Sequence, residues 1–425
     1  MATRVEAQTS MSVSDYDYSS FFYSSSDDPF AILEPYSEWY TRALQQGYYL
    51  FQQPMSTPPR SRIDVTEGLH HQHIALLNLA SYNYLGMSHR PEVIEAAKAA
   101  LDQYGLGAAG SPLLSGMMDI HVQLEEALAK FKRKESAMIF PTGYSTNVGM
   151  ISGLMRPGDW IIADQNAHAS IVDGAILSKA NVRFFRHNNP ADLEKKLKQT
   201  SGKKLVAIEG VYSMDGDVCP LPELVEVAKR YGARILLDEA HSAFVYGEHG
   251  RGVAEMYGLE DEVDIHIGTF SKALGGQGGY VAGSRQLYNY LKGFARARVF
   301  SCSLAPAVTA GVLKSLEIAQ AEPELRDRLW RNVKHIRGRL GDEGVDVGDS
   351  TSQIIPIMVR NDRRIFELGH KLFRAGLYLQ PVIYPAVAKH RSRFRVSISA
   401  SHTYEQLDEG VSILVRVLRE EGVMV

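Results

Sequence analysis

The chain has 425 residues, of which 45% are hydrophobic and 22% are charged, and its formal net charge is -3 at pH 7. These values are ordinary for a globular protein, and so small a negative charge gives no reason to expect nucleic acid as a partner. Two cysteines, Cys219 and Cys302, are too few for a disulfide framework, which favours a reducing compartment. No apolar run reaches the roughly 18 residues that a membrane-spanning helix needs, and the N-terminus lacks a signal-peptide core. We therefore expect a cytoplasmic protein with room for two domains.

The N-terminal residues differ in composition from the rest of the chain. Residues 1–28 are predicted to be a disordered tail, because residues 7–28 are rich in Ser, Asp and Tyr. Residues 29–74 follow as an arm and linker, with many aromatic side chains in Phe30–Phe51 and a helix expected near Pro35. We expect this arm to pack on the main body. The alternative is an apolar lip for a greasy ligand or a membrane surface, and the sequence does not support membrane contact on its own.

Residues 75–310 alternate short apolar runs with helical patterns. The expected helices include Leu193–Gln199 and Glu223–Tyr231. The expected strands are Ser136–Phe140, Trp160–Ala163, Val182–Phe185, Leu205–Glu209, Ile235–Asp238 and Ile265–Gly268. This alternation predicts an α/β domain with a mostly parallel central sheet.

Residues 311–425 are assigned to a smaller α+β domain, reached through a long helix over about Ala305–Ala321. Within this domain, the pattern predicts a helix over Arg326–Leu340 and strands over Ile354–Val359 and Phe394–Ser399. We find no internal repeat.

Asp238 is the first of two informative residues. It closes the apolar run Ile235–Leu237, which is typical of a buried parallel strand. An acid at the carboxyl end of such a strand lies where open α/β sheets bind ligands. The alternative is an ordinary helix N-cap aspartate.

Lys272 is the second, in the segment Thr269-Phe270-Ser271-Lys272. The hydroxyls of Thr269 and Ser271 can bind a phosphate, and glycines over Gly275–Gly279 leave room for a flat ring. A lysine that forms a Schiff base, with an acid for the ring nitrogen, is the minimum that pyridoxal phosphate (PLP) requires of a protein. A solvated surface lysine is the alternative.

Two other motifs carry no function here. Asp238-Glu239-Ala240-His241 spells a helicase-type nucleotide motif, but the chain has no Gly-x-x-x-x-Gly-Lys-Ser/Thr loop to accompany it. Gly105-Leu-Gly107-Ala-Ala-Gly110 spells a dinucleotide fingerprint, which must follow a strand. It follows the helical pattern of Val93–Tyr104 instead.

Further candidates match the remaining needs of PLP. Pro141-Thr142-Gly143-Tyr144 precedes an expected helix, whose N-terminal amides can hold a phosphate; an ordinary strand-helix turn is the alternative. His168 follows a strand and can stack on a ring, although a lone histidine is more often structural. His241 can reach the phenolic oxygen of PLP. Arg395 is a candidate for bidentate carboxylate recognition, with a surface charge as its alternative.

In this combination the chain resembles the α-oxoamine synthase family of fold-type I PLP enzymes, over roughly residues 75–420. The motifs that carry the resemblance are Ser81-Tyr-Asn-Tyr-Leu-Gly86, Gly107-Ala-Ala-Gly-Ser111, His121-x-x-Leu-Glu125, Thr142-Gly-Tyr-Ser-Thr-Asn147, His168-Ala-Ser170, Glu209-Gly-Val-Tyr-Ser-Met-Asp-Gly-Asp217, Asp238-Glu-Ala-His-Ser242, Gly250-Arg-Gly252, Thr269-Phe-Ser-Lys272, Phe300-Ser-Cys-Ser-Leu-Ala-Pro306 and Arg393-Phe-Arg395.

The resemblance implies a role for each catalytic candidate. Lys272 would bind the cofactor and act as acid and base at the substrate Cα. Asp238 would pair with the pyridinium nitrogen, and His241 with the phenolic oxygen. His168 would stack on one face of the ring and Ala240 on the other.

The resemblance also implies the remaining contacts. The phosphate would be held by Gly143, Tyr144 and Thr269, with Ser301 or Ser303 from the neighbouring subunit of a homodimer. Ser213 would lie near the phenolic oxygen. The substrate would be bound by Tyr82, Asn83 and Arg395.

The implied reaction is a decarboxylative Claisen condensation of a small amino acid with an acyl thioester, on coenzyme A or an acyl carrier protein, giving an α-amino ketone. A tyrosine at the position of Tyr82 is similar to the pattern of the serine palmitoyltransferase branch. Lys272-Ala-Leu-Gly-Gly276 and Phe300–Pro306 are similar to 2-amino-3-ketobutyrate CoA ligase, which uses glycine and acetyl-CoA. The aromatic arm favours a long or unusual acyl group, in sphingoid-base synthesis or in polyketide off-loading.

Two other activities stay open. One is a threonine-aldolase-like or aminotransferase reaction, which the His168-Ala-Ser170 and Arg393-Phe-Arg395 patterns disfavour. The other is a non-catalytic partner subunit of the same fold. Such subunits typically lack the lysine, whereas Lys272 is present.

Overall fold

The computed structural model describes residue 13, residues 18–66 and residues 73–424, in two compact units. The larger unit consists of Tyr82–Ser213 and Asp217–Leu329. The smaller unit takes the described parts of Met1–Ser81, together with Met214–Gly216 and Trp330–Val425. The expected boundary at residue 310 therefore falls inside the larger unit, and the N-terminal arm belongs with the C-terminal residues.

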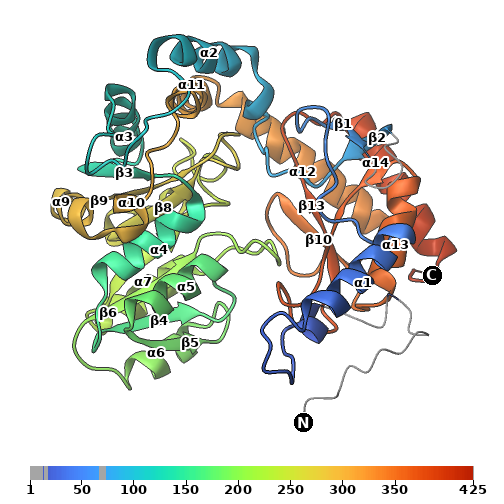
Figure 1. The fold of residues 1–425 in the computed structure, drawn as a ribbon, viewed down its shortest axis with the longest axis horizontal. Coiled ribbons are helices and arrows are strands. Elements are labelled where there is room, and N and C mark those ends of the chain that lie inside the picture. Colours follow the sequence, from blue (N-terminus) through green and yellow to red (C-terminus); the bar gives the residue numbers. More distant parts are fainter. Residues whose placement is uncertain (1–12, 14–17, 67–72, 425) are drawn as a thin grey trace. The chain divides into compact units, whose positions relative to one another are not determined.

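A seven-stranded sheet forms the centre of the larger unit (Figure 1). Its strands, in order across the sheet, are β3 (Ser136–Phe140), β9 (Gly279–Gly283), β8 (Ile265–Thr269), β7 (Arg234–Asp238), β6 (Lys204–Glu209), β4 (Trp160–Asp164) and β5 (Asn181–Phe185). Neighbouring strands are parallel except at β9, which runs antiparallel to both β3 and β8. The α/β prediction and all six predicted strands are confirmed. Strand β9 was not predicted, and only its first residue, Gly279, belongs to the glycines that were expected to leave room for a flat ring.

The helices of the larger unit include the predicted segments. The helix expected before Gly105 is α2 (Pro91–Tyr104), so the Gly105–Gly110 motif follows a helix and is no dinucleotide fingerprint. The other elements are η3 (Met87–His89), α3 (Asp119–Phe131), α4 (Gly143–Leu154), α5 (Ala169–Ser178), α6 (Pro190–Leu197), α7 (Leu221–Arg230), α8 (Val253–Met256), η4 (Glu260–Glu262), α9 (Arg285–Phe294), α10 (Arg296–Val299), α11 (Pro306–Ala321) and the start of α12 (Glu324–Asp342).

The core of the larger unit explains why its strands read as continuous apolar runs. Strands β3, β8 and β9 are buried along their whole length. Ile161 of β4 and Leu236 of β7 belong to one buried cluster with Ile151 of α4 and Ile171 of α5. Strands with helices on their faces need apolar residues at consecutive positions rather than at alternating ones.

The smaller unit contains two three-stranded sheets. The first has the order β1 (Arg62–Thr66), β2 (His73–Asn78) and β11 (Leu377–Tyr378), and the second has β10 (Ile354–Met358), β13 (Arg393–Ser397) and β12 (Gln380–Val382). Its helices are η2 (Tyr18–Phe21), α1 (Leu33–Gln45), most of α12, α13 (Arg364–Arg374) and α14 (Tyr404–Glu420). The predicted helix near Pro35 corresponds to α1.

The aromatic arm packs within the smaller unit. Trp39 of α1 is buried in a cluster with Tyr49, and its Nε1 donates to the Val13 carbonyl at 3.1 Å. His370 of α13 bonds the Gly47 carbonyl at 2.8 Å. These contacts match the expected packing of the arm. The predicted disorder does not extend to Tyr18–Phe21, which form η2, and most of the rest of that tail lies outside the described residues.

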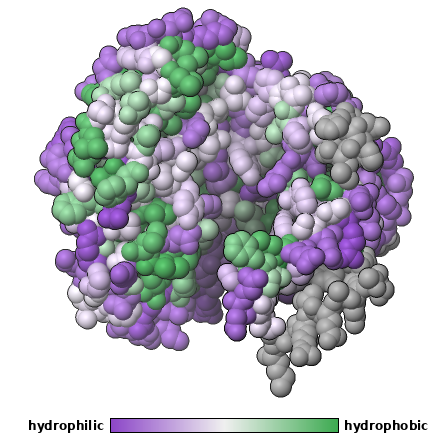
Figure 2. Space-filling model, viewed as in Figure 1, coloured by the Kyte–Doolittle hydropathy of each residue, from purple (hydrophilic) through white to green (hydrophobic). Residues whose placement is uncertain are grey.

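The surface bears exposed apolar side chains, and Figure 2 shows such residues gathered in patches among hydrophilic ones. On the larger unit they include Leu106, Leu114 and Phe300, which are 86%, 83% and 73% exposed. Among the helices of the described residues, none is both long and apolar enough for a membrane span.

Candidate active site

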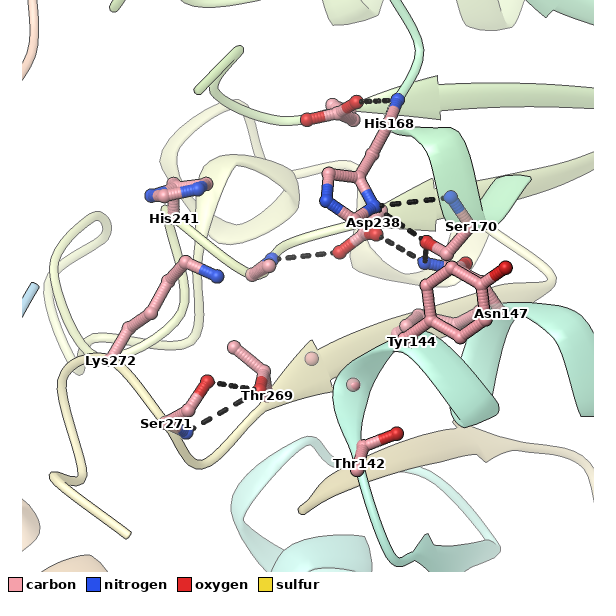
Figure 3. A pocket seen from close by; sticks show the side chains of 15 residues that line it. Thr142, Tyr144, Asn147, His168, Ser170, Asp238, His241, Thr269, Ser271 and Lys272 are labelled. Carbon is pink, nitrogen blue, oxygen red and sulfur yellow. Dashed lines mark hydrogen bonds between the residues drawn. The ribbon is translucent and has the colours of Figure 1, made fainter. Parts of the chain in front are cut away.

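The carboxyl ends of β3, β4, β6, β7 and β8 meet at one edge of the central sheet, because these strands run parallel. A cavity of about 230 Å³ opens at this edge within the larger unit. Its lining comes from the segments that end or follow these five strands, and Figure 3 shows their side chains around a common space. Residues far apart in the sequence therefore contribute to one site.

Asp238 ends β7 and is only 5% exposed. Its Oδ2 accepts a hydrogen bond from Asn147 Nδ2 at 2.7 Å, and its Oδ1 accepts one from the Ala240 amide at 2.9 Å. These two donors hold the carboxylate in one orientation at the wall of the cavity. The helix N-cap alternative is wrong, since the next helix, α8, begins only at Val253.

Lys272 lies in the loop between β8 and β9 and lines the same cavity as Asp238 (Figure 3). Its side chain is half-buried, and its Nζ lies 5.7 Å from the centre of the Tyr82 ring. This position differs from that of a solvated surface lysine.

The glycines after Lys272 serve backbone packing. Gly275 has a φ of +64°, and a Cβ there would lie 2.3 Å from the Ser88 amide nitrogen. A Cβ on Gly279 would lie 2.9 Å from the Gly143 Cα. Glycine thus lets β9 pass close to the start of α4. The expected room for a flat ring over Gly275–Gly279 is not the reason for these residues.

His168 is the N-cap residue of α5. Its backbone amide donates to Glu209 Oε1 at 2.5 Å, and its Nδ1 lies 2.7 Å from Ser170 Oγ. The ring faces the open cavity. Desolvation by the cavity wall lowers the pKa of His168, and so does the nearby Lys272 ammonium. The Asp238 carboxylate acts in the opposite direction. A neutral, flat imidazole at this wall suits contact with an aromatic ring.

His241 follows β7 and is buried. Its Nδ1 is hydrogen-bonded to the Tyr84 hydroxyl at 2.7 Å, and its ring makes an edge contact with Tyr82, with centroids 6.3 Å apart. Asn83 donates to Ser88 Oγ at 2.8 Å and does not line the cavity. Tyr84, which the sequence analysis did not single out, therefore supports the His241 ring without lining the cavity itself.

Amide and hydroxyl groups gather at one end of the cavity. Gly143 and Tyr144 begin α4, which Thr142 caps by accepting from the Ser145 amide at 2.9 Å. Thr269 Oγ1 and Ser271 Oγ lie 2.9 Å apart. A Cβ on Gly143 would lie 2.8 Å from Thr269 Oγ1, so glycine allows the helix N-terminus to approach these hydroxyls. Such a set of donors suits a phosphate group.

Several predicted residues lie elsewhere. Ser213, Ser301 and Ser303 are not among the residues that line the described cavity. Ser303 donates its amide to the Gly110 carbonyl at 3.0 Å. Arg395 lies on β13 in the smaller unit, where its Nη1 is 3.9 Å from Met214 Sδ.

Among the polar side chains that line the cavity, Asn147, Ser170 and Glu209 received no role from the sequence. All three lie within quoted motifs. Buried polar side chains near the carboxyl end of a predicted strand were the available signal, but their partners lie far away along the chain.

The donor set fits PLP. Amides and hydroxyls are present for a phosphate, a carboxylate for a protonated ring nitrogen, an imidazole for a ring face and an amine for a carbonyl carbon. Each of these groups is one that PLP requires for binding or for its chemistry.

Comparison with known proteins agrees with this chemistry. The model of the aminotransferase class I and II family matches residues 74–414. Serine palmitoyltransferase of Sphingobacterium spiritivorum is 43% identical over 347 residues, covering 81% of this chain and 87% of the relative. The 8-amino-7-oxononanoate synthase of Alkaliphilus metalliredigens is 40% identical over 367 residues, covering 84% and 93%.

A solved structure of serine palmitoyltransferase with its PLP internal aldimine has a TM-score of 0.88 and 34% identity, covering 93% of this chain and all of that one. The named relatives are all α-oxoamine synthases, and the structural neighbour was solved with PLP. The chain therefore belongs to the α-oxoamine synthases, fold-type I PLP-dependent acyltransferases that condense an amino acid with an acyl thioester and release carbon dioxide.

Proposed function

We propose that the cavity holds PLP with its ring between His168 and Ala240. In this arrangement Asp238 pairs with the ring nitrogen and His241 with the phenolic oxygen. The bound cofactor supplies an electron sink for charge that develops at the substrate Cα. The observation that supports this orientation best is the fixed carboxylate of Asp238, held by Asn147 and the Ala240 amide on the cavity wall.

The phosphate is proposed to lie at the other end of the cavity. The amides of Gly143 and Tyr144 and the Thr269 hydroxyl would hold it, since they converge at the N-terminus of α4. Ser213 would lie near the phenolic oxygen.

Lys272 is proposed to carry the proton at the substrate Cα, first removing it and later returning it. Its amine shares the cavity with Asp238 and His168, so it lies where a bound amino acid would react. Tyr82, Asn83 and Arg395 are proposed to recognise the substrate. For Tyr82, the support is its ring contact with Lys272 and His241.

The proposed substrates are L-serine and a long-chain acyl thioester, on coenzyme A or an acyl carrier protein. Tyr82 and the 43% identity to a serine palmitoyltransferase support this choice. A second candidate pairs glycine with acetyl-CoA, as favoured by the segment Lys272–Gly276 and by Phe300–Pro306. Off-loading of a polyketide chain is consistent with the same chemistry.

We also propose a homodimer in which Ser301 or Ser303 reaches the phosphate of the partner's site. Three large apolar side chains are exposed on the same unit as these serines: Leu106, Leu114 and Phe300. The Ser303 amide donates to the Gly110 carbonyl, which joins the segment after Phe300 to the segment between Leu106 and Leu114. Large exposed apolar side chains favour burial against another chain. Sedimentation should then give twice the chain mass, and Leu114→Glu with Phe300→Glu should shift it toward the monomer.

The substrate proposal is tested by titrating the PLP-loaded protein with glycine, L-alanine, L-serine and L-threonine while following its visible absorbance. L-serine is expected to change the spectrum at the lowest concentration. Thioesters with acyl chains of increasing length are then added, and free thiol release and product mass are measured. A response to glycine and acetyl-CoA alone would favour the second candidate. A spectrum that none of the four amino acids changes would contradict both.

A further inference from the structure

Glu209 is a buried acid in the cavity wall without an assigned role. It ends β6 and is 3% exposed. In the parallel pairing of β6 with β7 it stands directly opposite Asp238. Two carboxyl groups therefore lie side by side at the edge of the sheet where the cavity opens.

The Glu209 carboxyl group has a specific partner on another element. Its Oε1 accepts from the His168 amide at 2.5 Å. Because His168 is the N-cap of α5, its amide lies outside the bonds of the helix and needs such an acceptor. The His168 ring is attached at a second point, where Nδ1 lies 2.7 Å from Ser170 Oγ. The backbone bond and the ring bond together determine which way the imidazole faces.

The groups around Glu209 come from every neighbouring element. They are Asp238 on β7, Asp164 on β4, His168 at α5, Lys272 in the β8–β9 loop and the hydroxyl of Tyr212, which lies 3.5 Å from the Glu209 amide. Burial and the negative charges of Asp238 and Asp164 raise the pKa of Glu209 well above its ordinary value, while the His168 amide and Lys272 oppose this shift.

We propose that Glu209 is a positioning residue, which holds the His168 imidazole against the cavity by accepting the His168 amide through one carboxyl oxygen. This inference rests on the proposed function only for what the imidazole then contacts, namely the face of the cofactor ring. A single oxygen acceptor of the right length is sufficient for the role. An amide side chain should therefore replace the carboxyl group, whereas an apolar side chain of similar size should not.

The test compares Glu209→Gln with Glu209→Leu. Hydrogen exchange of the His168 amide, followed by mass spectrometry on the cofactor-free protein, should be unchanged in Glu209→Gln and at least tenfold faster in Glu209→Leu, because the leucine leaves the amide without its acceptor. The Kd for PLP, read from the visible absorbance, should change less than about twofold in Glu209→Gln and rise roughly tenfold in Glu209→Leu.

A matched control is Glu125, another buried glutamate, which does not line the cavity. Its Oε1 accepts a hydrogen bond from the Ile139 amide at 3.0 Å. Glu125→Leu should leave exchange at His168 unchanged, in contrast to Glu209→Leu. If Glu209→Leu does not fold, Glu209→Asp serves instead, since its shorter side chain cannot reach the same amide. Equal damage from Glu209→Gln and Glu209→Leu, or unchanged exchange at His168 in Glu209→Leu, would overturn the proposal.

The two proposals can fail separately. A wild-type protein that acquires no visible band with PLP would contradict the proposed function. The exchange measurement on the cofactor-free protein would still decide whether Glu209 holds His168.

Discussion

Asn147 of α4 donates from Nδ2 to the Asp238 carboxylate at 2.7 Å, across 91 positions of the sequence. The same amide nitrogen lies 3.0 Å from Ser170 Oγ. Asn147 is 2% exposed, so the bond is shielded from water. This hydrogen bond fixes the orientation of the acid that faces the proposed ring nitrogen. It also connects helix α4, whose N-terminus is the proposed phosphate site, to the acid at the other end of the cavity.

Replacing Asn147 with leucine should weaken PLP binding. The leucine leaves one oxygen of a buried carboxylate without its donor, a loss of about 1–3 kcal/mol. We expect the Kd for PLP, measured by the visible absorbance of titrated cofactor-free protein, to rise by one to two orders of magnitude. Asn332→Leu is the control, because Asn332 does not line the cavity and is a buried asparagine of the smaller unit whose Nδ2 donates to the Ser399 and His402 carbonyls. An equal effect of both substitutions would contradict a special role for the Asn147–Asp238 bond.

Replacing Lys272 with alanine should abolish condensation while the fold is retained. General acid–base catalysis typically contributes about 10²–10⁴-fold, so kcat should fall at least that far. The measurement is thiol release from the acyl thioester, together with circular dichroism of the variant. The exposed Lys314, paired with Glu317, provides a lysine control whose replacement should change kcat little. Residual activity of Lys272→Ala close to the wild type would rule out the proposed proton transfer.

His402 should make the protein less stable below neutral pH. It is fully buried, its Nδ1 accepts the Ser399 amide at 3.0 Å, and its Nε2 donates to the Asn78 carbonyl at 3.0 Å. Burial lowers its pKa from 6.5 to about 4, although the hydrogen bond that Nε2 donates to the Asn78 carbonyl opposes the shift. Below pH 6.5 this histidine therefore becomes protonated in the unfolded chain but stays neutral in the folded chain. The free energy of unfolding consequently falls as the pH is lowered from 6.5 to about 4.

The size of this effect is on the order of 3 kcal/mol, since one pKa unit corresponds to about 1.4 kcal/mol. Urea unfolding of the wild type and of His402→Asn at pH 7 and pH 4.5 would measure it. The difference between the two proteins should shrink as the pH falls. A difference that stays constant across this range would contradict the assignment to His402.

Lys132 forms a buried ion pair with Glu239, the residue that follows Asp238 in the chain. The Lys132 ammonium also contacts the Arg251 carbonyl, and neither side chain is more than 1% exposed. Although burial acts against it, the charge of Lys132 lowers the pKa of Glu239 to about 2. Lys132→Met should lower the free energy of unfolding by about 3–5 kcal/mol, because it removes the lysine charge that balances a buried carboxylate.

The double variant Lys132→Met with Glu239→Gln should be more stable than Lys132→Met alone, since it also removes the charge of the carboxylate. The exposed pair of Lys98 and Glu95 gives the control, for which Lys98→Met should cost less than about 1 kcal/mol. Urea unfolding of the four proteins provides the comparison. Equal losses for Lys132→Met and Lys98→Met would show that burial of the pair does not matter.

The central sheet was predictable because most of its parallel strands are buried along nearly their whole length. Segments such as Ile265–Thr269 therefore read as unbroken apolar runs. Strand β9 was not predictable in the same way. Its first residue, Gly279, is required by the close approach of Gly143, a contact between residues far apart in the chain.

The candidate site was predictable as a set of residues at strand ends, but its internal bonds were not. Asp238 and Lys272 could be named from local context, whereas Asn147, Glu209 and Tyr84 depend on partners brought close by the sheet order. The unit division was hidden for a similar reason. Strand β2 pairs with β11 through Leu77 and Leu377, which joins the N-terminal arm to the C-terminal residues.

The most direct test of the account is borohydride reduction of the PLP-treated protein, followed by proteolysis and mass spectrometry. Reduction fixes the cofactor to the lysine that holds it. The account predicts one phosphopyridoxyl group, on the peptide that contains Lys272, and its loss in Lys272→Ala. A label on a different lysine, or no label on a protein that has been saturated with PLP, would contradict it.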